Sequence, residues 1–252
     1  MMLLIVNADD LGTSEKVNDE VFELMASGLV TSASLIANAP AFGHAVSKIR
    51  SFPNCSFGVH LNLTVFHPLS SSAGLDAVLN RDGSLSKKLF QTGISSDLHK
   101  AFTRELSAQV QRVLDAGIPV SHFDSHQHIH TIPRMFPVLK TLQRRFGVRK
   151  VRCTITLLPA SERMTRLRSL RKRLFRFALR HIYTTKSPDG LGDFLDFYAL
   201  LGTAQIPQFR CLELMVHPGT TNPRYEEEVD FLRSDWVRRL PKEVRRGSYH
   251  SL

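Results

Sequence analysis

The chain has 252 residues, of which 42% are hydrophobic and 22% are charged, and its formal net charge is +10 at pH 7. This length allows one full α/β core or two small ones, and the composition is that of a globular protein. Three scattered cysteines argue against a disulfide framework and for a reducing compartment, the cytoplasm, and no apolar run reaches the roughly 20 residues of a membrane helix.

The first half of the chain alternates predicted strands and helices. Residues 3–8 form an apolar run typical of a strand buried on both faces, not a signal peptide, and Asp9 and Asp10 follow at its end. Further strands are expected at 29–37 and 56–63, and helices at 14–28, 42–49 and 97–116. Residues 64–95 are rich in proline, serine and glycine, which predicts a loop that forms a wall or lid over a site.

The stretch from His122 to His130 holds four of the eleven histidines of the chain. In an extended strand, alternation places five polar side chains on one side: His122, Asp124, His126, His128 and His130. Such a face is costly to bury unless its members bond each other or a metal ion. The stretch therefore predicts a metal or catalytic site, and a solvated edge strand is the alternative.

The second half continues the alternation and contains a strongly basic segment. We expect a helix at 133–146, a strand at 148–154, a loop at 186–193, a strand ending at His217 and a helix at about 226–240. Residues 162–181 hold eight basic residues and one acid. Apolar residues recur there every three to four positions, which predicts an amphipathic helix at 163–182: Met164, Leu167, Leu170, Leu174, Ala178 and Ile182.

The alternation of strands and helices predicts an α/β fold, either a parallel barrel or an open sheet. A distorted TIM-like (β/α) barrel is preferred, because polar residues end several well-separated strands, and residues 1–252 are expected to form one domain. A carboxylate and two imidazoles form a facial set that leaves positions on a divalent metal open. Asp9 and Asp10 alternate in direction along a strand, so one can bind the metal while the other accepts a proton.

Each of these signals is weak alone, since an Asp-Asp pair can be a capping turn, His60 a core histidine and His217 a turn residue. Five stretches together are more specific: residues 4–12, 28–34, 58–64, 122–130 and 216–219, the last reading Val-His-Pro-Gly. In these stretches the chain resembles the YdjC-like carbohydrate deacetylases. The resemblance implies a barrel related to the polysaccharide deacetylase fold, often dimeric, that removes an acetyl group from an N-acetylated carbohydrate such as a chitooligosaccharide by metal-activated water.

The resemblance also implies a role for each site residue. It places a divalent ion, most simply Mg²⁺, on Asp10, His60 and His126, although imidazoles also accept Zn²⁺, Mn²⁺ or Co²⁺. It suggests Asp9 as the general base and His217 as the group that stabilises or protonates the leaving amine. The residues left to orient the ligands are His122, Asp124 and His128.

Two departures from the family pattern concern the substrate. The family has Thr-x-Gly-x-Pro where this chain has Phe66 between Thr64 and Pro68, and a bulky Phe66 at the site wall would alter which sugar fits. The basic helix at 163–182 is also richer in arginine than the family requires. The substrate is therefore the least transferable part of the resemblance.

Two other functions compete with a deacetylase. A metal phosphoesterase also uses His-x-His tracts and carboxylates, but it needs more carboxylate ligands than the sequence offers. A binding protein would use the basic helix to dock nucleic acid, an anionic membrane surface or an acidic partner. The ordinary interpretation of that helix is a solvated outer helix of the barrel.

Overall fold

The computed structural model describes residues 1–152, 166–201 and 209–252. Residues 153–154 of the predicted strand and 163–165 of the predicted basic helix lie outside the described residues. Within the described part of the chain, no helix combines the length and the apolar character that crossing a membrane requires.

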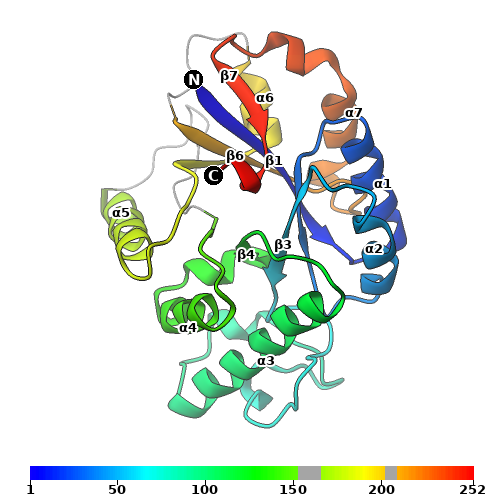
Figure 1. Ribbon diagram of the computed structural model, residues 1–252. Coiled ribbons are helices and arrows are strands. Elements are labelled where there is room, and N and C mark those ends of the chain that lie inside the picture. Colours follow the sequence, from blue (N-terminus) through cyan, green and yellow to red (C-terminus); the bar gives the residue numbers. More distant parts are fainter. Residues whose placement is uncertain (153–165, 202–208) are drawn as a thin grey trace.

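A parallel sheet occupies the centre of the molecule (Figure 1). Its strands are β1 (Met2–Leu11), β2 (Ser32–Leu35), β3 (Ser56–Leu61), β4 (Phe123–Ser125), β5 (Gly190–Asp193), β6 (Cys211–Val216) and β7 (Val244–Gly247). The strand order is β4-β3-β2-β1-β6-β5, and β7 lies beside the first half of β1 while β2 lies beside its second half. Every pair is parallel, so the prediction of an α/β fold with a parallel sheet is confirmed.

The sheet continues beyond β4 through two isolated parallel bridges. Phe123 pairs with Val151, and Lys150 pairs with Lys186, four residues before β5 begins. These bridges curve the sheet toward its other edge, and the described strands form a half-barrel.

Helices cover the outside of this sheet (Figure 1). They are α1 (Glu15–Ala26), α2 (Phe42–Ile49), α3 (Ser96–Asp115), α4 (Phe136–Phe146), α5 (Arg166–His181), α6 (Phe194–Leu200) and α7 (Glu228–Arg233). Ser14 caps α1 by accepting a hydrogen bond from the Val17 amide, and Gly147, in the left-handed region, ends α4. Because the strands are all parallel, the carboxyl ends of β1, β3, β4 and β6 lie at the same edge of the sheet.

The prediction of one extended strand at 122–130 is wrong beyond Ser125. Residues His126–Thr131 form a 3₁₀ turn in which Gln127 and His128 have φ of 52° and 55°. The left-handed residues reverse the chain locally, so the five polar side chains do not share one face.

Other departures follow from short or glycine-rich elements. The predicted loop at 186–193 contains β5, whose Gly190 lies so close to the Phe209 ring that a Cβ would approach it to 2.7 Å. Packing against Phe209 therefore requires glycine at this position of the strand, whereas in the sequence the glycines of this segment indicate a loop. The predicted helix at 226–240 divides at Ser234 into α7 and the 3₁₀ turn Asp235–Arg239, and α6 and β7 were not predicted.

The segment 64–95 is a loop with structure of its own. It contains the 3₁₀ turns Asp76–Val78 and Lys87–Phe90 and an antiparallel bridge between Leu79 and Leu85. Four of its apolar side chains are buried in the core: Leu75, Val78, Leu85 and Leu89. Packing explains how so long a loop is ordered; its role as a lid remains a prediction.

Candidate metal and catalytic site

Three donors predicted to bind a metal lie together at the carboxyl edge of the sheet. Oδ1 of Asp10 lies 3.3 Å from Nε2 of His60 and 4.0 Å from Nε2 of His126. The two imidazole rings meet edge to face, with centroids 6.0 Å apart. The structure thus brings together one residue from β1, one from β3 and one from the turn after β4.

The other nitrogen of each imidazole is already bonded. Nδ1 of His60 lies 2.9 Å from Oδ1 of Asp124, and Nδ1 of His126 lies 2.7 Å from Oγ1 of Thr64. An outer bond of this kind fixes the orientation of a metal-binding histidine. Both rings therefore present Nε2 toward the Asp10 carboxylate.

The Asp10 carboxylate supplies the test of whether an ion fits. Its Oδ1 is buried and has no directed hydrogen-bond partner, although His60 Nε2 is near. Ligand atoms at about 2.1 Å around one octahedral ion are separated by about 3 Å. The 3.3 Å between Oδ1 of Asp10 and Nε2 of His60 matches this spacing, whereas the 4.0 Å from Oδ1 to Nε2 of His126 is longer. The donor types and the unpartnered Oδ1 therefore fit a divalent ion bound by Asp10 and His60, with His126 as the more distant third donor.

The backbone of Asp10 explains how two neighbouring aspartates serve one site. In a regular strand Asp9 and Asp10 would point to opposite faces. Asp10 instead has φ of 64°, and the register with β2 shifts between Ala8 and Leu11. This irregularity turns the Asp10 carboxylate toward His60, and backbone strain of this kind is often found at functional sites.

A buried arginine that the sequence analysis missed lies at the centre of the site. The Arg152 guanidinium is inaccessible to solvent and forms two hydrogen bonds to Asp9, of 2.5 and 2.6 Å. It also lies 2.9 Å from Oδ2 of Asp124 and 2.9 Å from Oε1 of Glu213. One cation thus pairs with and orients three buried carboxyl groups from β1, β4 and β6.

Hydrogen bonds around this arginine extend into the core. Ser34 donates to Oδ2 of Asp124 over 2.7 Å and lies 3.2 Å from Nε2 of His122. The His122 ring stacks on Tyr249 with centroids 3.6 Å apart, and the Tyr249 hydroxyl donates to Glu213. Among the hydrogen bonds of the described residues, Ser34 links His122 to Asp124, and the orienting role of His122 stays a prediction.

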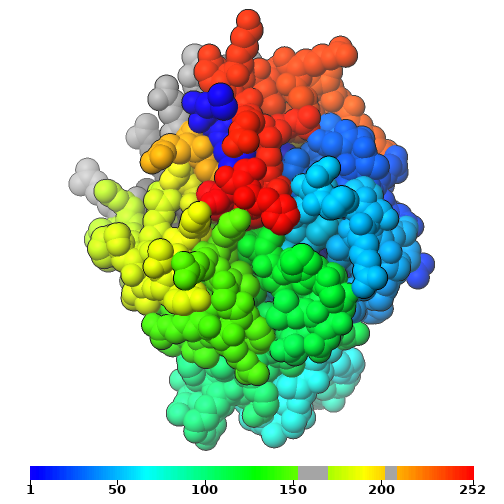
Figure 2. Space-filling view, in the orientation of Figure 1, coloured from blue at the N-terminus to red at the C-terminus, as the bar shows by residue number. Residues whose placement is uncertain are grey.

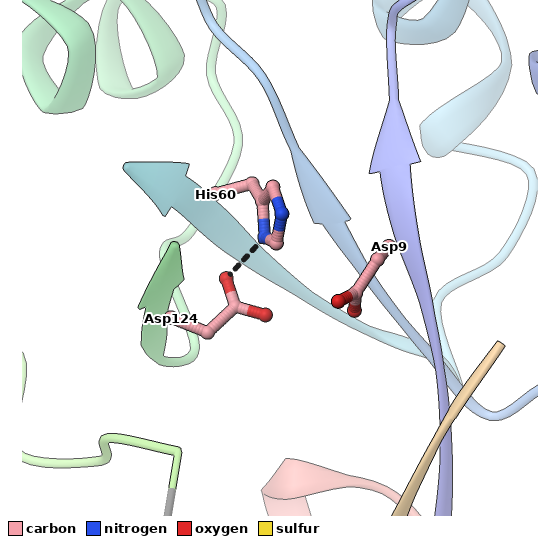
Figure 3. Close-up of side chains that lie close together, drawn as sticks. All are labelled: Asp9, His60 and Asp124. Atoms are coloured by element: carbon pink, nitrogen blue, oxygen red, sulfur yellow. Dashed lines mark hydrogen bonds and ion pairs between the residues drawn. The ribbon is translucent and has the colours of Figure 1, made fainter. Parts of the chain in front are cut away.

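Asp9, His60 and Asp124 form a second group of possible metal donors (Figure 3). One donor atom from each lies within 4.8 Å of the others, and all three residues are buried. The carboxylates of Asp9 and Asp124, however, already accept hydrogen bonds from Arg152, and an ion between them would face the guanidinium. Asp10 has no such competitor.

The charges of the site set its protonation. Burial lowers the pKa of His60, but the carboxylates of Asp124, Asp9 and Asp10 outweigh burial and raise it to about 10. Burial raises the pKa of Asp9 and of Asp10, yet Arg152 in the first case and His60 in the second hold it below the ordinary value. Both aspartates are therefore ionised at neutral pH.

Comparison with known proteins identifies the family of this chain. The family model described as YdjC-like protein matches residues 3–243. The chain belongs to the YdjC-like family. A carbohydrate deacetylase of Geobacillus stearothermophilus is 37% identical over 142 residues, which are 56% of this chain and 56% of the relative. A chitooligosaccharide deacetylase of Salmonella schwarzengrund is 36% identical over 148 residues, 58% of this chain and 57% of the relative. The chain therefore spans less than two thirds of the length of the curated relatives that it matches.

A solved structure supports the fold of this YdjC-like chain. The crystal structure of a proposed cellobiose-phosphate cleavage protein from Enterococcus faecalis V583 has a TM-score of 0.79 and 21% identity, and covers 99% of this chain and 98% of that chain. At this identity the likeness concerns the fold alone.

His217, from the family stretch after β6, lies on the other side of Asp9. Its Nε2 is 4.0 Å from Oδ2 of Asp9, and its ring stacks on Tyr225 with centroids 4.1 Å apart. The Glu228 carboxylate accepts the amide N–H of His217 and fixes the backbone there. A cavity of about 290 Å³ is lined by Asp9, Asp10 and His217, so open space adjoins these side chains.

Within the described part of the chain, no hydrogen bond joins the predicted metal ligands to His128, predicted to orient them, or to Phe66, predicted at the site wall. His128 has a buried Nδ1 without a hydrogen-bond partner, and no bond among the described residues joins it to a ligand, so its orienting role stays a prediction. Phe66 has φ of 62°, the left-handed region that favours glycine. The glycine of the family pattern therefore matches the backbone here, and Phe66 is strained.

Glu213 could have been found from the sequence, because it is the one charged residue in the apolar run 211–216. A charge in a buried strand is costly without an opposite charge, so Glu213 signals a buried cation. Arg152 shares the predicted strand 148–154 with Arg149 and Lys150, so the sequence does not show which of these cations is buried.

Proposed function

We propose that this chain is a metal-dependent hydrolase that removes the acetyl group from an N-acetylated sugar or oligosaccharide of the chitooligosaccharide type. The observation that carries the proposal is the buried, unpartnered Oδ1 of Asp10 facing Nε2 of His60 and of His126. The names of the similar deacetylases support the substrate class.

The metal ligands would be Asp10, His60 and His126. When bound, a divalent ion supplies a water of lowered pKa and polarises the acetyl carbonyl. Mg²⁺ is the first candidate, and Zn²⁺, Mn²⁺ and Co²⁺ are tested beside it because imidazole ligands accept them. Asp124 and Thr64 hold the two imidazoles in position through their Nδ1 atoms.

Asp9 is the proposed general base. Its two oxygens accept hydrogen bonds from Arg152, and Asn7 donates a third of 2.8 Å, so the carboxylate is fixed and ionised. The low pKa of Asp9 makes it a weak base that holds a proton briefly. His217, whose Nε2 lies 4.0 Å from Asp9, would pass a proton to the leaving amine.

The finer architecture belongs to the same proposal. We infer that the bridges at Val151 and Lys186 continue around a distorted TIM-like barrel, and that residues 1–252 act as one catalytic domain. Segment 64–95 begins with Thr64, which bonds His126, and would form the site wall. We further propose a dimer, which the resemblance implies, and a cytoplasmic location, which cysteine usage favours.

Acetate release tests the function directly. The metal-stripped protein is given N-acetylglucosamine and its oligomers with each of the four ions added back. We expect metal-dependent acetate release that Asp10→Asn and His126→Ala reduce about a hundredfold or more, together with metal affinity. Asp97→Asn and His250→Ala, exposed residues away from the site, are the matched controls.

Two results would contradict the proposal. One is acetate release that needs no divalent ion or survives both substitutions. The other is metal-dependent phosphate release from a phosphomonoester without acetate release, which would identify a phosphoesterase. The second outcome is disfavoured because Arg152 already binds two of the nearby carboxylates, Asp9 and Asp124.

A further inference from the structure

The apolar stripe of the basic helix α5 faces solvent. Leu170, Leu174 and Phe177 are 52%, 60% and 63% exposed, and Ile182, just beyond the helix, is 42% exposed. The sequence predicted a stripe through Leu170 and Leu174, and the structure shows that this chain does not bury it. Four of the seven exposed large hydrophobic residues among the described residues lie within this short segment.

The opposite side of α5 attaches the helix to the protein. Leu179 is fully buried, and Phe175 meets the Phe136 ring edge to face at 5.5 Å. Arg176 and Arg180 both pair with Asp189, the residue before β5. The helix is therefore held by one apolar face while it presents a second apolar face to solvent. It lies at the edge of the molecule (Figure 1).

Positive charge flanks the outward stripe. Helix α5 contains no acidic residue. At 100° per residue, Leu170, Leu174 and Phe177 span a narrow arc, with Arg171 on one side and Arg173 on the other. Both arginines are exposed, and among the described residues no ion pair involves either of them. In Figure 2 this yellow-green region lies at the margin of the molecule.

We propose that α5 is a docking surface for an anionic membrane. A stripe of leucine and phenylalanine flanked by arginines matches an interface in which apolar side chains enter the acyl boundary and cations meet lipid phosphates. Nucleic acid would use the arginines but leave the apolar stripe in water. A second copy of α5 would bring its arginines against those of the first.

Vesicle sedimentation tests this surface. The full chain is mixed with vesicles of phosphatidylcholine alone or of phosphatidylcholine and phosphatidylglycerol in equal parts, at low and high salt. We expect binding to the anionic vesicles that weakens at high salt, and little binding to the neutral vesicles. The stripe shares no residue with the catalytic site, so vesicle binding and acetate release can be lost independently.

Two sets of variants separate the apolar and charged contributions. The triple change Leu170→Gln, Leu174→Gln and Phe177→Gln should reduce binding about tenfold or more, because it removes the inserting side chains and keeps the charge. Arg171→Gln with Arg173→Gln should reduce binding and its salt dependence. The control is Phe90→Gln with Leu114→Gln, two apolar residues that are 42% and 36% exposed elsewhere. Circular dichroism of each variant confirms that the fold is kept.

Several outcomes would overturn the proposal. The first is no binding to anionic vesicles at low salt, and the second is equal binding by the triple variant. A third is a dimer, seen by light scattering, that the triple variant dissociates, because a second copy would then cover the stripe. A fourth is tight binding to duplex DNA that the triple variant retains, with no vesicle binding.

Discussion

Arginine has opposite environments in two regions of this protein. In the candidate site a single arginine, Arg152, is inaccessible to solvent and contacts three carboxylates. In α5, a helix without acids carries several arginines, and Arg171 and Arg173 remain exposed. The arginines of α5 dominate the charge pattern of the sequence, whereas Arg152 holds the carboxylates of the candidate site in position.

The difference shows that the environment of a charge, rather than the number of charges, determines its energetic role. An exposed arginine is screened by water and contributes little to stability. A buried arginine among carboxylates cannot be removed without leaving charge uncompensated in a medium of low dielectric constant. The two regions therefore predict opposite responses to the same substitution.

The largest effect is expected for Arg152→Gln. The change leaves three buried carboxylates without their cation and should lower the free energy of unfolding by about 3–5 kcal/mol. The matched change Arg171→Gln in α5 should lower it by no more than about 0.5 kcal/mol. Urea denaturation measures both, and similar losses for the two variants would contradict the contrast.

Glu228, which holds the His217 backbone, gives a pH-dependent test. Burial raises the pKa of Glu228 to about 8, from an ordinary value of 4.5. A raised folded pKa means that the folded state keeps the proton longer, so this contribution to stability is complete below pH 4.5 and is lost as pH rises through about 8.

Glu228→Gln mimics the protonated acid and should abolish that loss. The variant should match the parent near pH 4.5 and exceed it by about 2–4 kcal/mol above pH 8. Glu227→Gln, an exposed neighbour, should show no such gain. Thermal unfolding across this pH range measures the stability gain of Glu228→Gln over the parent. A gain that is largest in acid would refute a raised pKa of Glu228.

Thr64→Val tests the outer bond of His126. Valine keeps the shape of threonine but removes the Oγ1 partner of Nδ1, so the imidazole is less well oriented. We expect divalent-ion affinity, measured by calorimetry, to fall about tenfold. Thr103→Val removes a comparable hydroxyl on α3 and should leave the affinity unchanged. Unchanged affinity in Thr64→Val would mean that this bond does not orient the ligand.

The smallest effect concerns the strain at Phe66 in the same loop. Phe66→Ala removes the ring but keeps a Cβ at positive φ, whereas Phe66→Gly also removes the Cβ. The glycine variant should therefore be about 1 kcal/mol more stable than the alanine variant. At Phe90, which does not have positive φ, glycine should be the less stable of the two. Chemical denaturation of the four variants measures the difference in free energy of unfolding between glycine and alanine at each position, which should have opposite signs at Phe66 and Phe90.

Segments with a strong local pattern could be predicted from the sequence. The apolar run before Asp9 and the capped helix α1 are local patterns, and they form as expected. The strand at β5 was missed because the contact of Gly190 with Phe209 is a tertiary one that no local pattern records. Whether a short segment such as β5 forms a strand depends on its packing against the surface that it covers.

The sequence by itself determined the α/β class, through its alternating pattern, and the family, through five matching stretches, and from that resemblance it predicted Asp10, His60 and His126 as metal ligands. Only the tertiary structure decided that the chain reverses after Ser125, that Asp10 turns inward and that Arg152 joins Asp9 to Asp124. It also decided that the apolar stripe of α5 faces outward. These features depend on contacts between residues far apart in the chain, whose energies are set by burial and by the charges that burial brings together.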